Sequence, residues 1–330
     1  MAILVCGGAG YIGSHAVAKL VEDGHKVIIV DNLQKGHKEA VWEGAKLYIG
    51  DLRDTDFLDR VFSENKVEAV MHFAADSLVG ESVEDPLKYY ENNVFGTLYL
   101  LKAMLKYNVK KIVFSSTAAT YGEPENIPIL ETDKTEPTSP YGETKLASEK
   151  LLKWAERAYD IKYTILRYFN VAGAHESGKI GEDHNPESHL IPIVLQVALG
   201  KRDKIAIFGA DYDTHDGTCI RDYIHVNDLV DAHILALDRL NKGGTSNIYN
   251  LGNGNGFTVK EVIEVARKIT KHPIPAEIKD RRAGDPARLI ASSEKAMKEL
   301  NWKPSNSSLE QIIESAWNWH KNNINGYEEV

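Results

Sequence analysis

The sequence is poor in cysteine and lacks both a long apolar run and a long run of like charge. Cys6 and Cys219 are too few to form a disulfide framework, so we expect a reducing compartment, the cytoplasm. No apolar run approaches the roughly 20 residues that a membrane-spanning helix needs. The first expected strand begins at Ile3, which leaves no room for a signal peptide.

Charge and histidine content narrow the partners further. The formal net charge is −9, and no basic cluster stands out, so we expect neither nucleic acid nor an anionic membrane as a partner. The twelve histidines are scattered, and His184 and His189 come nearest to a pair. We therefore expect solvated or core histidines and predict no metal. The 330 residues, of which 43% are hydrophobic, suffice for one large or two medium domains.

A glycine-rich turn lies near the start of the chain. The apolar run 3–6 leads into Gly7-Gly8-Ala9-Gly10-Tyr11-Ile12-Gly13, a helical pattern follows, and a second apolar run ends in Asp31. The glycines permit a tight turn and let the backbone approach a pyrophosphate at the helix N-terminus. Asp31 is placed to bond the ribose hydroxyls of an adenosine, and its charge would repel a 2′-phosphate. The pattern therefore predicts NAD in preference to NADP.

Strands and helices alternate through the first half of the chain. We expect strands at 3–6, 26–30, 46–49, 68–73, 111–114 and 163–169, with a long helix from about 86 to 107. This alternation predicts an α/β fold with a doubly wound, Rossmann-like parallel sheet, whose ligand lies beyond the carboxyl ends of the strands. After about residue 170 the pattern fades into loops, a helix near 191–199 and isolated short elements. We therefore predict a first domain at 1–169 and a smaller α/β domain at 170–330.

Two further sites follow expected strands. Asp51 could bond an adenine amino group, or it could cap the next helix. Ala74 and Ala75 suit the close passage of a cofactor, although small residues also simply pack.

Tyr141 and Lys145 lie four residues apart, behind a proline-rich loop that fixes where their helix begins. An ammonium beside a phenol favours the phenolate, so the pair can lower a tyrosine pKa of about 10 toward neutrality. Such a shift of roughly three units requires on the order of 4 kcal/mol. Alone, this spacing is typical of an ordinary helix surface, and it gains meaning from the glycine turn before it.

The combination of the glycine turn, Ser115-Ser116-Thr117 and Tyr141-x-x-x-Lys145 resembles the extended short-chain dehydrogenase/reductase superfamily. Longer segments resemble the UDP-glucose 4-epimerase family in particular. These segments are Gly7 to His15, Tyr89-Tyr90-Glu91-Asn92-Asn93-Val94, Ser139-Pro140-Tyr141-Gly142, Arg167-Tyr168-Phe169-Asn170, Arg221-Asp222-Tyr223-Ile224-His225-Val226, and Arg281-Arg282-Ala283-Gly284-Asp285. The similarity runs from residue 2 to about residue 320.

The resemblance implies roles for individual residues. Thr117, Tyr141 and Lys145 would be catalytic. An NAD-binding domain would use Gly7, Gly10, Tyr11, Ile12, Gly13, Asp31, Asn32, Asp51, Leu52, Phe73, Ala74, Ala75, Asn92, Tyr141, Lys145 and Phe169. A UDP-sugar-binding domain would add Asn170, His189, Leu190, Phe208, Arg221, Tyr223, Arg282 and Asp285 to Thr117 and Tyr141. Ser77 stands where the family often has a lysine. Ser188-His189-Leu190 stands where the family commonly has a pair of asparagines in the sugar loop.

The implied reaction inverts C4 of a hexose attached to UDP. Tyr141 as phenolate would remove the proton of the 4′-hydroxyl through Thr117, while the C4 hydride passes to NAD. The 4-ketose would then turn and take the hydride back on its other face, so NAD should stay bound. The family also pairs as a homodimer through the helix after Pro86 and the Tyr141 helix. The stripes Tyr90, Val94, Leu98, Leu101, Leu105 and Leu146, Leu151, Leu152, Ala155 fit that pairing, or they face the sheet.

Four other functions compete with this one. Leu289 falls where some members have a bulky tyrosine, so a dual or main activity on UDP-N-acetylglucosamine is an alternative. A nucleotide-sugar dehydratase would carry an Asp-Glu pair where Ala118-Ala119 stand. A net dehydrogenase would have to exchange its nicotinamide at each turnover. A non-catalytic NAD-binding protein would need neither Tyr141 nor Lys145.

Overall fold

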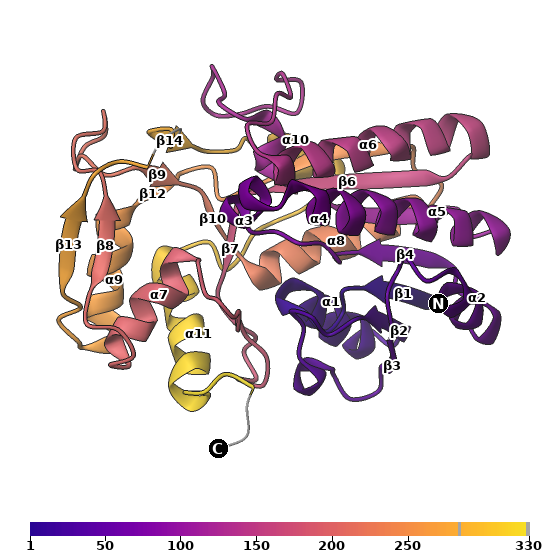
Figure 1. Ribbon diagram of the computed structural model, residues 1–330, viewed down its shortest axis with the longest axis horizontal. Helices are drawn as coiled ribbons and strands as arrows, with labels where there is room; N and C mark the ends of the chain where they lie inside the picture. The colour runs from indigo at the N-terminus through magenta and orange to yellow at the C-terminus, as the bar shows by residue number, and fades with distance from the viewer. Residues whose placement is uncertain (283–284, 328–330) are drawn as a thin grey trace.

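The computed structural model describes residues 1–282 and 285–327, and Figure 1 shows a large α/β part beside a smaller one. The large part contains a seven-stranded sheet in the order β11-β6-β5-β4-β1-β2-β3, in which every neighbouring pair is parallel. Its strands are β1 (Ala2–Cys6), β2 (Lys26–Asp31), β3 (Lys46–Ile49), β4 (Ala69–His72), β5 (Lys111–Ser115), β6 (Lys162–Tyr168) and β11 (Asn247–Leu251). The predicted doubly wound fold is confirmed.

Helices cover both faces of this sheet because side chains along each strand point alternately to opposite faces. Ile3 and Val5 of β1 pack with α1 (Tyr11–Glu22) and α8 (Val226–Asn241). Leu4 and Cys6 pack on the other face with α2, α5 and α6. The helices on that second face are α2 (Thr55–Glu64), α5 (Gly96–Lys106) and α6 (Pro140–Tyr159).

Local signals explain where the helices begin. Ser139 caps α6, its hydroxyl accepting from the Gly142 amide at 3.2 Å, and Pro140 occupies the first helical position. Asp54 caps α2 by accepting from the amides of Asp56 and Phe57. The alternative role of Asp51 as this cap is therefore excluded.

The long helix expected from 86 to 107 is interrupted. It consists of α4 (Pro86–Tyr89), a π-helical segment (Tyr90–Phe95) and α5, and α3 (Val79–Glu84) precedes it. π-Helical turns are rare and frequently occur at functional sites. This one contains Asn92 and Asn93, of which Asn93 is buried.

The second half of the chain is more regular than the sequence indicated. The expectation of loops and isolated short elements is wrong for α8, which has 16 residues, and for β11, which extends the large sheet beside β6. Asparagines at both Asn247 and Asn250 obscure the apolar pattern of that strand. Residues 226–251 thus return to the large part, and the division at 169/170 stays a prediction.

The smaller part has its own core, formed by α7, α9, α11 and β8. Figure 1 shows these elements side by side, away from the large sheet. Its elements are β7 (Asn170–Ala172), α7 (Leu190–Ala198), β8 (Ile205–Phe208), β9 (Ile220–Arg221), β10 (Tyr223–His225), β12 (Phe257–Thr258), α9 (Val259–Thr270), β13 (Ala276–Lys279), β14 (Arg288–Leu289) and α11 (Leu309–Asn322). Helix α10 (Glu294–Glu299) instead packs against β11 of the large sheet. Among the described residues, no helix combines the length and apolar character needed to cross a membrane.

Candidate active site

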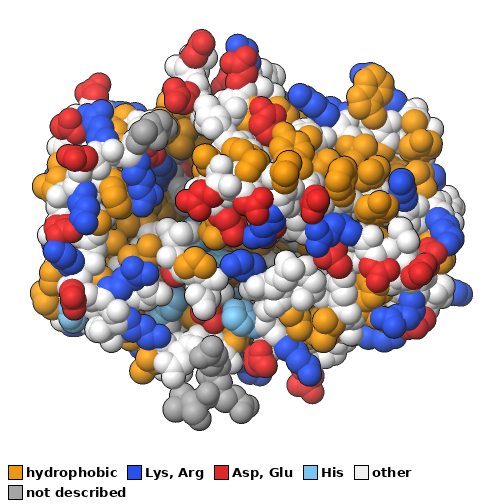
Figure 2. Space-filling model, in the orientation of Figure 1, with side chains coloured by type: hydrophobic (Ala, Val, Ile, Leu, Met, Phe, Trp, Pro, Cys, Tyr) orange, Lys and Arg blue, Asp and Glu red, His pale blue; other side chains and the backbone are white. Residues whose placement is uncertain are grey.

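The predicted site residues gather at one edge of the large sheet. Gly7 follows β1, Asp31 ends β2, Phe73 follows β4 and Phe169 follows β6, and the carboxyl ends of parallel strands share an edge. Thr117 comes two residues after β5. The fold therefore brings the predicted nucleotide and catalytic residues together. Figure 2 shows the surface hollowed between the large and the smaller part.

The glycine turn is shaped by close backbone contact. Gly7 has a φ of +80°, and a Cβ there would lie 2.6 Å from the backbone nitrogen of Ala74. A Cβ on Gly13 would lie 2.0 Å from the Gly7 carbonyl oxygen. Helix α1 begins at Tyr11, directly after Gly10, so the positive end of its dipole faces the turn. These residues fit the pyrophosphate of NAD without side chains in the way.

Asp31 ties this turn to the end of β2. Its Oδ2 accepts from the Ala9 amide at 2.9 Å, and its Oδ1 accepts from the Leu33 amide at 2.9 Å. Burial raises the pKa of this carboxyl, while the two amides act in the opposite direction. Asp51 instead pairs with Arg53, whose Nη2 lies 2.7 Å from Asp51 Oδ2, and this pairing lowers the Asp51 pKa. Contacts of either carboxylate with adenosine stay predictions.

The loop after β4 is fixed from the π-helical segment. Asn93 Oδ1 accepts from the Asp76 amide at 2.8 Å, and its Nδ2 donates to the Asp76 carbonyl and to Thr144 Oγ1, each at 3.0 Å. One buried amide thus joins this loop to α6. Sequence reasoning selected Asn92 and assigned no role to Asn93, although a polar pair within an apolar helix was visible.

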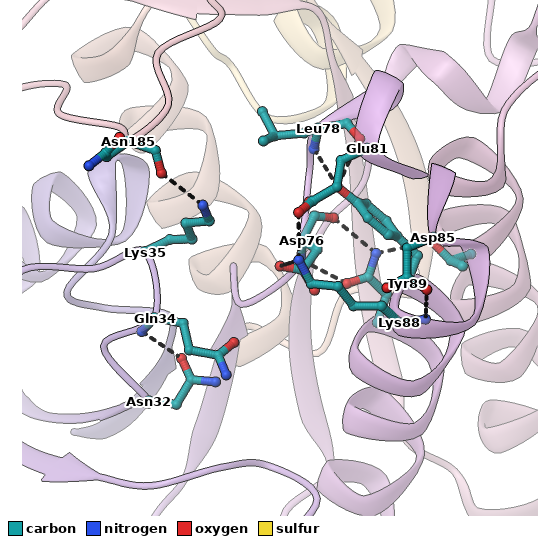
Figure 3. Close-up of polar contacts among 12 residues, drawn as sticks. Asn32, Gln34, Lys35, Asp76, Leu78, Glu81, Asp85, Lys88, Tyr89 and Asn185 are labelled. Carbon is teal, nitrogen blue, oxygen red and sulfur yellow. Dashed lines mark hydrogen bonds and ion pairs between the residues drawn. The ribbon is translucent and has the colours of Figure 1, made fainter. Parts of the chain in front are cut away.

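Figure 3 shows polar contacts on both sides of this region. Lys88 Nζ lies 2.7 Å from Glu81 Oε1 and 4.0 Å from Asp76 Oδ1, so a cation approaches the loop in which Ser77 lies. Across from it, Lys35 Nζ donates to the Asn185 carbonyl at 2.9 Å. A loop of the second half is thereby tied to the segment after β2.

Tyr141 and Lys145 lie on α6 beside the end of β5. Lys145 is buried, and its Nζ donates to the Ser115 carbonyl at 2.8 Å. Burial lowers the pKa of Lys145 to about 8, and nearby Glu149 opposes that shift. Burial raises the pKa of Tyr141 to about 12, against a hydrogen bond with the Thr117 side chain that lowers it. In the protein alone, therefore, the pKa of Tyr141 lies above its usual value.

A buried polar network that the sequence did not reveal lies next to this pair. Arg167 Nε donates to Glu149 Oε1 at 2.9 Å, and Ser116 Oγ donates to the same oxygen at 2.6 Å. Arg167 also donates to the Tyr121 hydroxyl, which in turn donates to Asn250 Oδ1 at 2.7 Å. Arg167, which follows Ile165 and Leu166 in a strand of mostly buried residues, was the available signal, because a buried guanidinium requires a partner.

The predicted UDP-sugar residues form pairs at the smaller part. Arg221 Nη2 donates to Asp285 Oδ1, and the Arg282 guanidinium lies 4.0 Å from the centre of the Phe208 ring. Asn170 begins β7, and its Nδ2 donates to the Asp222 carbonyl at 3.2 Å. Asp222 lies between Arg221 and the buried Tyr223, and Tyr223 of β10 pairs with Asn170 of β7. Arg221, Tyr223 and Asn170 therefore lie together where β6 passes into β7. Ala283 and Gly284 of the predicted motif lie outside the described residues.

His189 and Leu190 are at the start of α7, where His189 belongs to a separate group. His189 Nδ1 lies 2.8 Å from Glu182 Oε1, and His184 Nδ1 lies 3.4 Å from the same oxygen. Glu187 completes the group, with its Oε1 3.3 Å from His189 Nδ1. Against burial, the two carboxylates raise the pKa of His184 to about 9 and that of His189 to about 10. The sequence signal was Glu-x-His-x-x-Glu-x-His, which matches no familiar ligand spacing.

Comparisons with known proteins agree with this geometry. The family described as the NAD dependent epimerase/dehydratase family matches residues 3–252. A UDP-glucose 4-epimerase of Halalkalibacterium halodurans is 64% identical over 327 residues, which cover 99% of this chain and 98% of that protein. A solved structure of a UDP-glucose 4-epimerase has a TM-score of 0.99 at 62% identity, with full coverage of both chains.

A further structure, a UDP-glucose 4-epimerase from Bifidobacterium longum in complex with NAD⁺ and UDP, has a TM-score of 0.93 at 43% identity. It covers 99% of this chain and 100% of that chain. The predicted resemblance and the predicted NAD dependence are confirmed. The chain belongs to the NAD dependent epimerase/dehydratase family.

Proposed function

We propose that this protein is an NAD-dependent UDP-glucose 4-epimerase, an isomerase that interconverts UDP-galactose and UDP-glucose. The observation that carries the proposal is the placement of Tyr141, Lys145 and Thr117 at the sheet edge that also holds the glycine turn. The 64% identity with a relative of that name, over nearly the whole chain, supports the same substrate class.

Each catalytic residue has a role that its position supports. Tyr141 removes and returns the proton of the 4′-hydroxyl, and Thr117 bridges that transfer. Lys145 supplies the positive charge that stabilises the phenolate. This charge matters because burial raises the Tyr141 pKa to about 12 despite the opposing hydrogen bond with Thr117. Bound at the glycine turn, NAD would supply reversible hydride transfer, and the net reaction would not be an oxidation.

The UDP group carries the binding energy, since the sugar must turn between the two hydride transfers. Arg221 and Arg282 bind the diphosphate, for which a guanidinium is suited by its planar fork of donors. Asn170, Phe208, Tyr223 and Asp285 complete the pocket for the UDP-sugar, and Leu190 lies at its sugar end. Asp31 selects NAD by bonding the adenosine ribose.

A second candidate is epimerisation of UDP-N-acetylglucosamine. Leu289, which is half-buried in β14 and pairs with Arg221 of β9, favours it because leucine leaves more room than tyrosine for an acetamido group. A solved relative is described as a UDP-Glc/GlcNAc 4-epimerase from Campylobacter jejuni, at 45% identity and a TM-score of 0.86. A dehydratase is not supported, since Ala118 and Ala119 follow Thr117 and offer no acid or base.

We also propose a homodimer, formed through α4, the π-helical segment, α5 and α6. Hydrophobic side chains gather over these helices in Figure 2, and Leu87 (74%) and Trp154 (64%) are among the most exposed of them. Leu101, Leu152 and Ala155 of the predicted stripes instead lie in the sheet-facing core. Light scattering at micromolar concentration tests the dimer, because a mass near 36.8 kDa would contradict it.

Mass spectrometry of the product separates the candidate functions. The protein is incubated with UDP-galactose and the products are resolved by chromatography. An epimerase yields UDP-glucose of unchanged mass, whereas a dehydratase yields a product lighter by one water. Loss of water, or no conversion of UDP-galactose, would contradict the proposed function.

Buried, free Cys6 and Cys219 fit a reducing compartment, and we propose the cytoplasm.

A further inference from the structure

Four ligand-type side chains converge in the loop before α7. One carboxylate oxygen each from Glu182 and Glu187 and one ring nitrogen each from His184 and His189 all lie within 4.8 Å of one another. Both carboxylate side chains are only 4% exposed. We propose that these four residues bind one divalent transition-metal ion, with Zn²⁺ the best match, as a closed structural site.

The spacing of the ligand atoms supports a tetrahedral ion. Bonds of about 2.0–2.1 Å to nitrogen and oxygen place neighbouring ligand atoms of a tetrahedron roughly 3.4 Å apart. His184 Nδ1 lies 3.4 Å from Glu182 Oε1. Its 3.7 Å approach to Glu187 is to Oε2, whereas His189 approaches Oε1, and only one of these two oxygens would be the ligand. His189 Nδ1 lies 3.3 Å from Glu187 Oε1. The 2.8 Å separation of His189 Nδ1 from Glu182 Oε1 is the shortest of these distances, and it requires a small adjustment.

The unmatched histidine nitrogens are a second, independent observation. Nδ1 of His184 and Nδ1 of His189 are both shielded from solvent, yet neither has a hydrogen-bond partner among the described residues. Carboxylate oxygens lie 2.8–3.7 Å from these nitrogens, yet no hydrogen bond joins them. An ordinary hydrogen-bonded His–Glu pair would leave neither nitrogen without a partner. An ion shared by the four side chains would explain why the groups lie so close without bonding to one another.

The donor set selects the class of ion. Two imidazole nitrogens with two carboxylate oxygens suit Zn²⁺ and its transition-metal neighbours. Ca²⁺ takes six to eight oxygen ligands, and Mg²⁺ keeps several waters, so neither suits two nitrogens. Because all four positions are filled by protein, this ion has a structural role and none in the epimerisation.

Surrounding contacts indicate what the ion would hold in place. The His184 ring lies edge-on to that of Tyr11, with 6.2 Å between the ring centres. In the same loop, His37 Nε2 lies 3.1 Å from the Asp183 carbonyl oxygen, and the Asn185 carbonyl accepts from Lys35. The ion would therefore fix the loop of the second half against the glycine turn and the segment after β2.

Metal analysis of the full-length protein tests this proposal. The protein is purified without chelators or metal-affinity steps and analysed by inductively coupled plasma mass spectrometry. Metal-free protein is then titrated with Zn²⁺ alone, and with Co²⁺ alone, whose visible absorption reports tetrahedral coordination. The variant is His184→Gln/His189→Gln. The control is His215→Gln, since the His215 side chain is 60% exposed and lies beside Glu261, away from the group.

We expect about one ion per chain in the wild type and the control, with tetrahedral Co²⁺ bands, and binding at least about tenfold weaker in the double variant. A chelator should lower the Tm of the wild type and leave that of the double variant unchanged. The proposal is overturned if the wild type neither contains nor binds Zn²⁺ and Co²⁺ at one per chain. Equal binding by the double variant also overturns it. If that variant does not fold, the wild-type stoichiometry and Co²⁺ spectrum decide.

Discussion

Lys145 and Glu149 lie one turn apart on α6, and both side chains are buried. The negative charge of Glu149 raises the pKa of Lys145, against burial, which lowers it to about 8. Glu149 is itself bonded to Arg167 and Ser116. The positive charge of Lys145, one turn after Tyr141, is therefore supported by a carboxylate that belongs to a separate buried network.

Glu149→Gln should lower the pH above which activity is lost. Without the carboxylate charge, the Lys145 pKa falls below about 8, so the ammonium is lost at lower pH. We expect the alkaline limb of kcat/KM against pH to move to lower pH. Glu143→Gln, an exposed change on the same helix, is the control. An unmoved alkaline limb in a folded Glu149→Gln protein would show that Glu149 does not act through Lys145.

Tyr141→Phe should fold and retain NAD but lose rate by roughly 10²–10⁴, as is typical for loss of a general acid/base. The substitution removes only the hydroxyl, and the ring keeps its edge-on contact with Tyr89 at 6.5 Å between centres. Steady-state conversion of UDP-galactose and the nicotinamide content of the purified variant are measured together. Near-normal turnover would remove Tyr141 from the centre of the mechanism.

Arg167→Met should lower the free energy of unfolding by about 3–5 kcal/mol, because it leaves the buried Glu149 carboxylate without its partner. The Arg167 side chain is only 3% exposed, so solvent cannot replace the lost bonds. Urea denaturation measures the change. Lys19→Met, which breaks the exposed pair with Asp23, should cost about 0–1 kcal/mol. Similar losses in the two variants would contradict the assigned burial cost.

Leu289→Tyr should suppress turnover of UDP-N-acetylglucosamine while largely sparing UDP-glucose and UDP-galactose. A tyrosine would narrow the space beside Arg221. One substituent more or less on the substrate changes discrimination in an apolar pocket by about 1–3 kcal/mol. The kcat/KM values of wild type and variant for both classes of sugar measure the discrimination. The pocket argument fails if the wild type shows no turnover of the acetamido sugar, or if the variant loses both activities equally.

Patterns local in sequence allowed most of the large part to be predicted. The glycine turn, Asp31 and the strands through β6 were visible because apolar runs and turn residues follow each other directly along the chain. The same locality places Gly7, Phe73 and Thr117 at one sheet edge once the strands are known to be parallel.

Relationships between distant residues could not be predicted. Arg167 and Glu149 belong to different elements, and only folding brings them together. The two stripes that include Leu101 and Leu152 satisfy helical spacing whether they face the sheet or a second subunit, and the structure places both residues in the core. Glu182 and His189 converge because their loop folds back on itself, which periodicity does not detect.

The most direct test of the account is to supply purified protein with UDP-galactose and no added nicotinamide, after assaying the NAD(H) released from a denatured portion. The glycine turn and the redox-neutral reaction predict NAD(H) retained through purification. They also predict UDP-glucose formation until equilibrium, with no net change in the nicotinamide. Protein that is empty, or that converts the sugar only while NAD is continuously supplied and consumed, would contradict the account.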